Sequence, residues 1–154
     1  AGNIEVMEDR PHERFSKLRR SLKLNNAYGG LIRTDALQRT KLNRLYSGGD
    51  IVLMAELALM GRFMLLPQTL LYRRMGRETS SNELSASDLA VFLDPQKTHN
   101  LDLLHFSTHL GYLGAALRAP INPLEKLKTL ALVCRHAAWD RENLLAELRG
   151  VLKK

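Results

Sequence analysis

A glycine-bounded apolar segment near the middle of the sequence limits what this chain can fold into. Between Gly49 and Gly61 the sequence reads DIVLMAELALM, in which Asp50 and Glu56 are the only charged residues. Aspartate is a common N-cap and glycine a common helix stop, so the segment predicts a helix capped by Asp50 and ended by Gly61. Because so few polar residues interrupt it, we expect this helix to be buried on most sides.

Short apolar runs on either side of this helix predict strands. Residues 27–32 predict a brief buried strand that leads into a helical turn at residues 33–35. Residues 62–66 and 69–72, which Pro67 and its neighbour separate, predict two further short strands.

Helices are predicted for both ends of the chain. Residues 11–24 have apolar side chains at helical spacing and basic ones on the other side, which predicts a surface helix. Residues 98–117 also have apolar side chains at helical spacing, which predicts a second helix. The pair Asn122-Pro123 predicts the start of another helix, and Asp140 predicts a fresh N-cap further along.

The size and composition of the chain indicate a single compact domain with its own core, since 45% of its 154 residues are hydrophobic. No run approaches the ~18 consecutive apolar residues of a membrane span, and the first residues are not expected to be a signal peptide. The only cysteine, Cys134, lies in an apolar run, which favours a buried thiol and excludes an internal disulfide. These features fit a cytoplasmic protein, either free or peripheral to a membrane.

Positive charge is concentrated in the N-terminal part of the chain. The whole chain has a net charge of +7, whereas residues 10–44 hold ten Lys/Arg against Glu13 and Asp35, which leaves a net charge of +8. Such a basic surface could face nucleic acid, anionic lipid or a phosphorylated substrate. A solvated face without a ligand is the more common meaning of a charge run, and we favour it here.

A set of short motifs runs through the middle of the chain in a fixed order. They are Gly29–Leu37, Gly48-Gly49-Asp50, Glu56–Leu59, Gly61-Arg62-Phe63 and Leu71-Tyr72-Arg73-Arg74. In order and spacing, residues 25–81 resemble the acceptor-side half of the catalytic domain of family 2 glycosyltransferases, the inverting enzymes with the GT-A fold. The resemblance implies an α+β, predominantly helical fold. Residues 1–82 would be the acceptor-side part with a small mixed-sheet remnant, and residues 83–154 a C-terminal helical subdomain.

The resemblance also implies a chemistry. Enzymes of this kind, hexosyltransferases among them, move a sugar from a nucleotide-sugar donor to a hydroxyl acceptor, and a base takes the acceptor proton. The family's base matches Asp50, and its diphosphate-binding cluster matches Arg73 and Arg74, of which at most one would face the site. Many relatives place a histidine just past this pair, where this sequence has Met75–Arg77.

The donor side of the family's site is missing from this sequence, which has no Asp-x-Asp motif and no glycine-rich phosphate loop. The divalent cation (Mg²⁺ or Mn²⁺) of a full-length parent enzyme is therefore not expected in this C-terminal half. We expect the half to be inactive alone, and to form a homodimer through apolar surface that the donor half would otherwise cover.

Other interpretations stay open. Asp50 by itself predicts only a helix cap. The missing histidine favours a non-catalytic scaffold or regulatory domain derived from a transferase. The basic helix 11–24 could bind anionic membrane or nucleic acid, although nucleic acid is disfavoured because aromatic residues do not alternate with the basic ones.

A row of histidines in the C-terminal part offers one more candidate site. His99, Asp102, His105 and His109 share one face of a predicted helix and could hold a transition metal. No ligand from a second segment is evident, so ordinary polar residues at a helix interface are the favoured interpretation.

Overall fold

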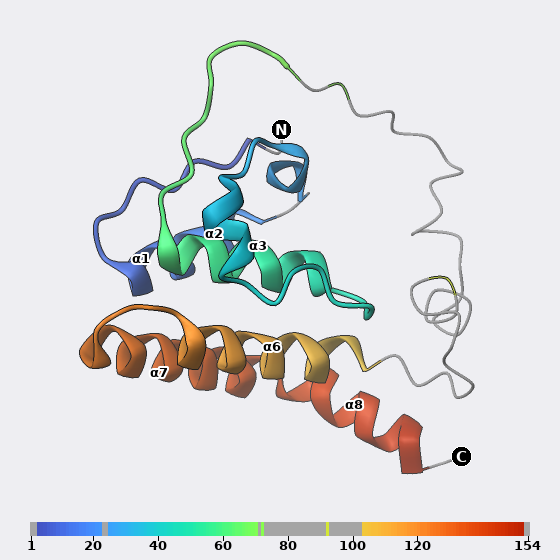
Figure 1. The fold of residues 1–154 in the computed structure, drawn as a ribbon. Coiled ribbons are helices and arrows are strands. Elements are labelled where there is room, and N and C mark those ends of the chain that lie inside the picture. The colour runs from blue at the N-terminus through green and yellow to red at the C-terminus, as the bar shows by residue number, and fades with distance from the viewer. Residues whose placement is uncertain (1–2, 23–24, 71, 73–91, 93–102, 153–154) are drawn as a thin grey trace.

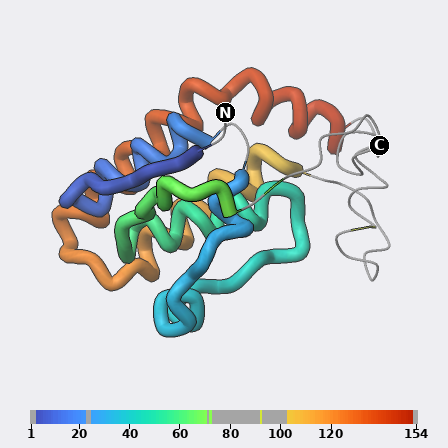
Figure 2. The backbone as a smooth tube through the Cα atoms, turned by 90° about the horizontal axis from the view of Figure 1, so that it is seen from above, coloured from blue at the N-terminus to red at the C-terminus, as the bar shows by residue number. Residues whose placement is uncertain are grey.

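Four helices form a closed ring in this protein (Figure 1). The computed structural model describes residues 3–22, 25–70, 72, 92 and 103–152. The four helices are α1 (Pro11–Ser21), α3 (Gly49–Met60), α6 (Leu104–Arg118) and α7 (Pro123–Trp139). Helix α3 packs against α1 and α6, and α7 packs against the same two helices. Figure 2 shows α1 lying along α7, so two helices far apart in the sequence pack side by side.

Three further elements complete the helices of the described part of the chain: the 3-10 helix η1 (Asn26–Gly29), α2 (Thr34–Gln38) and α8 (Arg141–Leu152). Both η1 and α2 contact α3, whereas α8 follows α7 directly and contacts α6 and α7. The helical turn predicted at residues 33–35 is confirmed as α2.

Helix α3 is the centre of the core. All its residues from Val52 to Leu59 are buried, and they pack with buried side chains of α1, α6 and α7. The ring of Phe15 in α1 meets that of Tyr112 in α6 edge to face, with centroids 5.3 Å apart. The predicted buried helix and its stop at Gly61 are confirmed. The prediction that Asp50 is the N-cap is wrong, because the cap position is Gly48 and Asp50 lies in the first turn.

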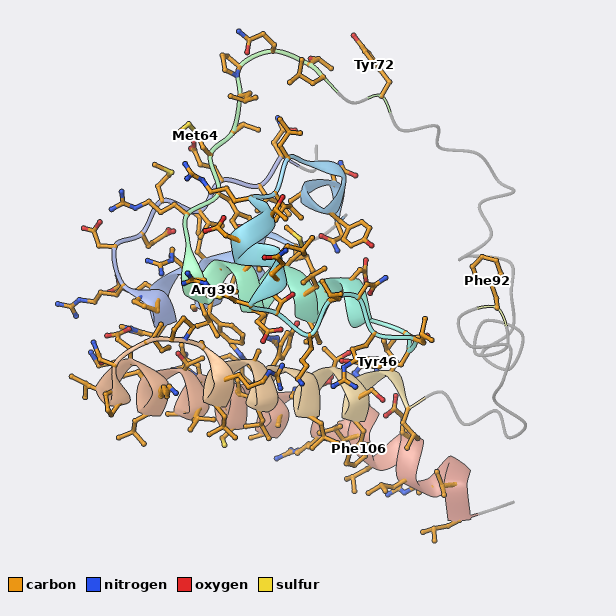
Figure 3. All side chains as sticks on the ribbon, viewed as in Figure 1. Arg39, Tyr46, Met64, Tyr72, Phe92 and Phe106 are labelled. Atoms are coloured by element: carbon orange, nitrogen blue, oxygen red, sulfur yellow. The ribbon has the colours of Figure 1, made fainter. Side chains whose placement is uncertain are left out.

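The expectation of an α+β fold with a small mixed sheet is contradicted. In the described ranges the only β pairing is an isolated antiparallel bridge between Val6 and Phe63, whose two N···O distances are 2.9 and 2.8 Å. Residues 27–32 begin within η1 instead of a strand, and residues 64–70 have no sheet partner. Short apolar runs cannot form a sheet without neighbours to accept their hydrogen bonds. Figure 3 shows the segment with Met64 and Tyr72 leading away from the helices.

The predictions for the chain ends are largely confirmed, and the fold is predominantly helical. The basic helix is α1, which ends at Ser21. Helix α7 begins at Pro123, and the side chain of Asn122 caps it by accepting a 2.9 Å hydrogen bond from the Glu125 amide. Cys134 is exposed, so the prediction of a buried thiol is wrong: it falls on the outer side of α7. The division near residue 82 stays a prediction.

Within the part of the chain that the structure describes, no helix combines the length and the apolar character that crossing a bilayer requires.

Candidate active site

The candidate base Asp50 lies where a tight turn delivers the chain into α3. Gly48 has φ 85°, a left-handed conformation that favours glycine. A Cβ on Gly49 would lie 2.3 Å from the Arg44 carbonyl oxygen, and one on Gly48 would lie 2.6 Å from the Thr108 hydroxyl oxygen. The glycine pair therefore lets the preceding loop and α6 approach the amino end of α3 closely.

One oxygen of Asp50 is held in place by a residue that the sequence analysis did not single out. Asn25 donates a hydrogen bond from Nδ2 to Oδ2 of Asp50, at 2.9 Å. The aspartate is partly buried, and its other oxygen has no hydrogen-bond partner among the described residues. Unpaired backbone N–H groups at the amino end of a helix favour a negative charge there. The arrangement gives an oriented carboxylate with one oxygen available to accept a proton.

Tyr112, which lies near Asp50 in the core, is unsuited to acid–base chemistry. Burial raises the pKa of Tyr112 to about 12, with Arg19 acting in the opposite direction and Tyr46 and Asp50 adding to the rise. The phenol therefore stays protonated at neutral pH, and its role is packing against Phe15.

Arg73 and Arg74 lie outside the described residues, as do His99 and Asp102.

His105 and His109, the two members of the histidine row that the structure describes, serve helix contacts. Nδ1 of His105 lies 2.6 Å from a carboxylate oxygen of Asp140, and Nδ1 of His109 donates to the His105 carbonyl oxygen at 2.8 Å. Among the described residues, no three histidine, cysteine or acidic side chains are grouped so as to hold a metal ion.

The basic surface of α1 is smaller than its sequence indicates. Arg14 is buried and Arg19 is partly buried, which leaves Lys17 and Arg20 as exposed cations in the helix. This loss weakens the interpretation of α1 as a module for anionic membrane or nucleic acid.

A second feature that the sequence analysis missed is an ion pair between α3 and α6 in which the glutamate is buried and the arginine is exposed. Glu56 is only 2% exposed, and its Oε1 accepts from Nε and Nη2 of Arg118 at 3.2 and 3.1 Å. Its Oε2 accepts from the Lys41 amide at 3.2 Å. A lone glutamate in an apolar helix signals such a pair, because a buried charge needs a partner. Nothing in the sequence points to a partner 62 residues away.

Comparison of this chain with protein-family models, with curated proteins and with solved structures gave no match.

Proposed function

We propose that this chain is the acceptor-side part of an inverting glycosyltransferase, which moves a sugar from a nucleotide-sugar donor to a hydroxyl acceptor. The observation that carries the proposal is the Asp50 carboxylate, held by Asn25 through one oxygen and free of described partners at the other. The motif order around Gly48-Gly49-Asp50 supports the same function.

In this proposal Asp50 acts as the general base. The acceptor hydroxyl transfers its proton to the free Asp50 oxygen as the hydroxyl oxygen bonds to the anomeric carbon. The bond from that carbon to the nucleoside diphosphate breaks on the opposite face, and the diphosphate leaves with the electron pair. Asn25 is a positioning residue that fixes the carboxylate orientation. Arg73 or Arg74 would bind the diphosphate by charge-assisted hydrogen bonds.

The test is an Asp50→Asn variant of the intact protein in which this chain occurs. Sugar transfer from a panel of labelled nucleotide-sugars to lipid and glycoside acceptors should fall by roughly 10² to 10⁴-fold, because the amide cannot take the proton. Circular dichroism and thermal unfolding should match those of the wild type, since asparagine keeps the size of the side chain and an acceptor oxygen for Asn25.

Asp35→Asn is the matched control, because Asp35 is an exposed acid in the first turn of α2. It should transfer sugar at the wild-type rate. The proposal is wrong if Asp50→Asn retains transfer, or if the wild-type intact protein transfers no sugar from any donor in the panel.

A further inference from the structure

A hollow of about 300 Å³ lies between α3, α6 and the loop that precedes α3. The loop contributes Lys41, Arg44 and Tyr46, α3 contributes Glu56, and α6 contributes Ser107 and Arg118. Asp50 is not among the lining residues, so this hollow is separate from the candidate active site. Its volume lies at the small end of the range for small-molecule sites.

Two glycines of α6, of which Gly111 lines the hollow, let neighbouring side chains come close to the helix backbone. A Cβ on Gly111 would lie 2.7 Å from the Tyr46 hydroxyl oxygen and 2.7 Å from a Val52 methyl carbon. A Cβ on Gly114, one turn further along, would lie 2.8 Å from Nη1 of Arg118. The surface of α6 therefore has no side chain where the Tyr46 hydroxyl and the Arg118 guanidinium come closest to it. Figure 3 shows Tyr46 directed toward this helix.

The charges around the hollow leave an excess of positive charge. The single carboxylate, Glu56, is already engaged by Arg118 and by the Lys41 amide. The Lys41 ammonium and the Arg44 guanidinium are exposed, and neither forms an ion pair within the described ranges. Two cations that have no acidic partner among the described residues therefore line a hollow that also offers the hydroxyl groups of Tyr46 and Ser107.

The loop that carries these cations is held in a strained conformation. Leu42 has φ 56°, the only non-glycine residue with positive φ in the described chain. Such a backbone is unfavourable for leucine and persists only where surrounding contacts enforce it. Here the Lys41 amide donates to Glu56 and the Leu42 amide donates to the Thr40 hydroxyl oxygen at 3.0 Å. Backbone strain of this kind is often found at binding sites, and Leu42 lines the hollow together with Lys41 and Arg44.

We propose that this hollow binds the phosphate group of a small phosphomonoester. A phosphomonoester carries close to two negative charges at neutral pH and presents three acceptor oxygens, which matches the Lys41 and Arg44 cations together with two hydroxyl donors. The arginine can meet two phosphate oxygens at once, and the lysine supplies a point charge. A phosphorylated metabolite and a lipid with a terminal phosphate share this chemistry.

The experiment is an amide-detected NMR titration of the chain at pH 7.5 and about 0.15 M salt, where surface charges are screened. The soluble probe is glycerol 3-phosphate and the lipid probe is vesicles of phosphatidylcholine with phosphatidic acid, with vesicles of phosphatidylcholine alone for comparison. Saturable binding with a dissociation constant of about 1 mM or lower is expected. Shifts should be confined to residues 41–46 and 107–111.

Arg44→Gln should weaken this binding about tenfold while leaving thermal unfolding unchanged, because Arg44 is exposed and its side chain holds no described partner. Arg149→Gln removes the same charge from the exposed surface of α8 and should bind as the wild type does. Binding of glycerol 3-phosphate alone identifies a soluble source, and binding of phosphatidic acid vesicles alone identifies a lipid source. The proposal is overturned if neither probe binds, or if Arg149→Gln weakens binding as much as Arg44→Gln.

Discussion

Arg14 belongs to the basic N-terminal segment, yet it is 7% exposed and joins α1 to the end of α3. Its Nε and Nη2 donate to the carbonyl oxygens of Ala58 and Leu59 at 2.7 and 2.9 Å. Its Nη1 donates to the Asp9 carbonyl oxygen at 2.7 Å. The last carbonyl groups of a helix have no partner within the helix, so this guanidinium acts as a tertiary cap for α3.

Replacing Arg14 with alanine should therefore destabilise the fold strongly. The change leaves buried carbonyl oxygens without donors and opens a space at the junction of α1 and α3. We expect a loss of about 3 kcal/mol in unfolding free energy and a fall of roughly 10 °C in Tm. Chemical and thermal denaturation followed by circular dichroism measure both quantities.

Lys17→Ala is the control for Arg14, because Lys17 is exposed on the same helix and has no hydrogen bond or ion pair with the described residues. It should change the unfolding free energy by less than about 0.5 kcal/mol. Equal stability of the two variants would show that the Arg14 hydrogen bonds contribute nothing net to the fold.

Arg14 and Cys134 show why the sequence was weakest at the residue scale. Arg14 was counted among surface charges but is buried, and Cys134 was expected inside but is exposed. Helical spacing predicts that one face of a helix is buried, but how many residues this buried face includes depends on which helices pack against it. For α7, contacts with α1, α6 and α8 decide that number, and none of these contacts can be inferred from the α7 sequence alone.

At the scale of elements, sequence signals predicted helix ends correctly where all the residues of the signal lie within or next to the helix itself. The glycine at the end of α3 and the Asn122-Pro123 start of α7 are such signals, and both predictions are confirmed. The predicted strands were wrong because a strand needs partners that the sequence does not identify. The loop strain at Leu42 and the Glu56–Arg118 pair likewise depend on contacts distant in sequence.

The start of α6 depends on such a distant contact. Its N-cap residue, Leu103, has no side chain that can accept a hydrogen bond from the helix. Instead, Glu147 of α8 accepts from the amides of His105 and Phe106 at 2.8 and 3.1 Å. A carboxylate at a helix amino end is favourable both as a hydrogen-bond acceptor and through the helix dipole.

Replacing Glu147 with alanine should weaken the contact between α6 and α8 without unfolding the four packed helices. Helix α8 has no buried residue, so Glu147 is a principal link between it and α6. We expect hydrogen exchange at the His105 and Phe106 amides to accelerate about tenfold, which corresponds to about 1.4 kcal/mol. Glu142→Ala, at an exposed acid of the same helix, should leave these two amides unchanged. If the His105 and Phe106 amides exchange at the wild-type rate in Glu147→Ala, water replaces the carboxylate as hydrogen-bond acceptor without loss of free energy.

At the scale of the whole molecule, the closed ring places one histidine among positive charges. His136 of α7 is 6% exposed, and its Nδ1 is buried without a hydrogen-bond partner in the described part of the chain. Burial lowers the pKa of His136 to about 4, and Arg19 and Arg20 of α1, Arg135 of α7 and His109 of α6 act in the same direction. The folded four-helix structure is thus more stable with His136 in its neutral form.

The stability of the ring should therefore fall on mild acidification. The unfolded chain binds a proton at His136 near pH 6.5, whereas the folded chain does so only near pH 4. The contribution of neutral His136 to the free energy of unfolding is complete above pH 6.5. It is lost as the pH falls to about 4, which lowers the free energy of unfolding by about 3 kcal/mol. Urea denaturation at a series of pH values between 7 and 4 measures it.

A His136→Gln variant separates this effect from that of the acidic residues, because glutamine does not titrate and its unfolding free energy should vary little between pH 6.5 and 4.5. Burial alone would raise the pKa of Glu125, but hydrogen bonds from His12 hold it below its usual 4.5, so stability from this pair is lost only at lower pH. Glu125→Gln should accordingly keep the wild-type loss above pH 4.5. A wild-type unfolding free energy that stays constant from pH 7 to 4.5 would contradict a lowered pKa of His136 in the folded chain.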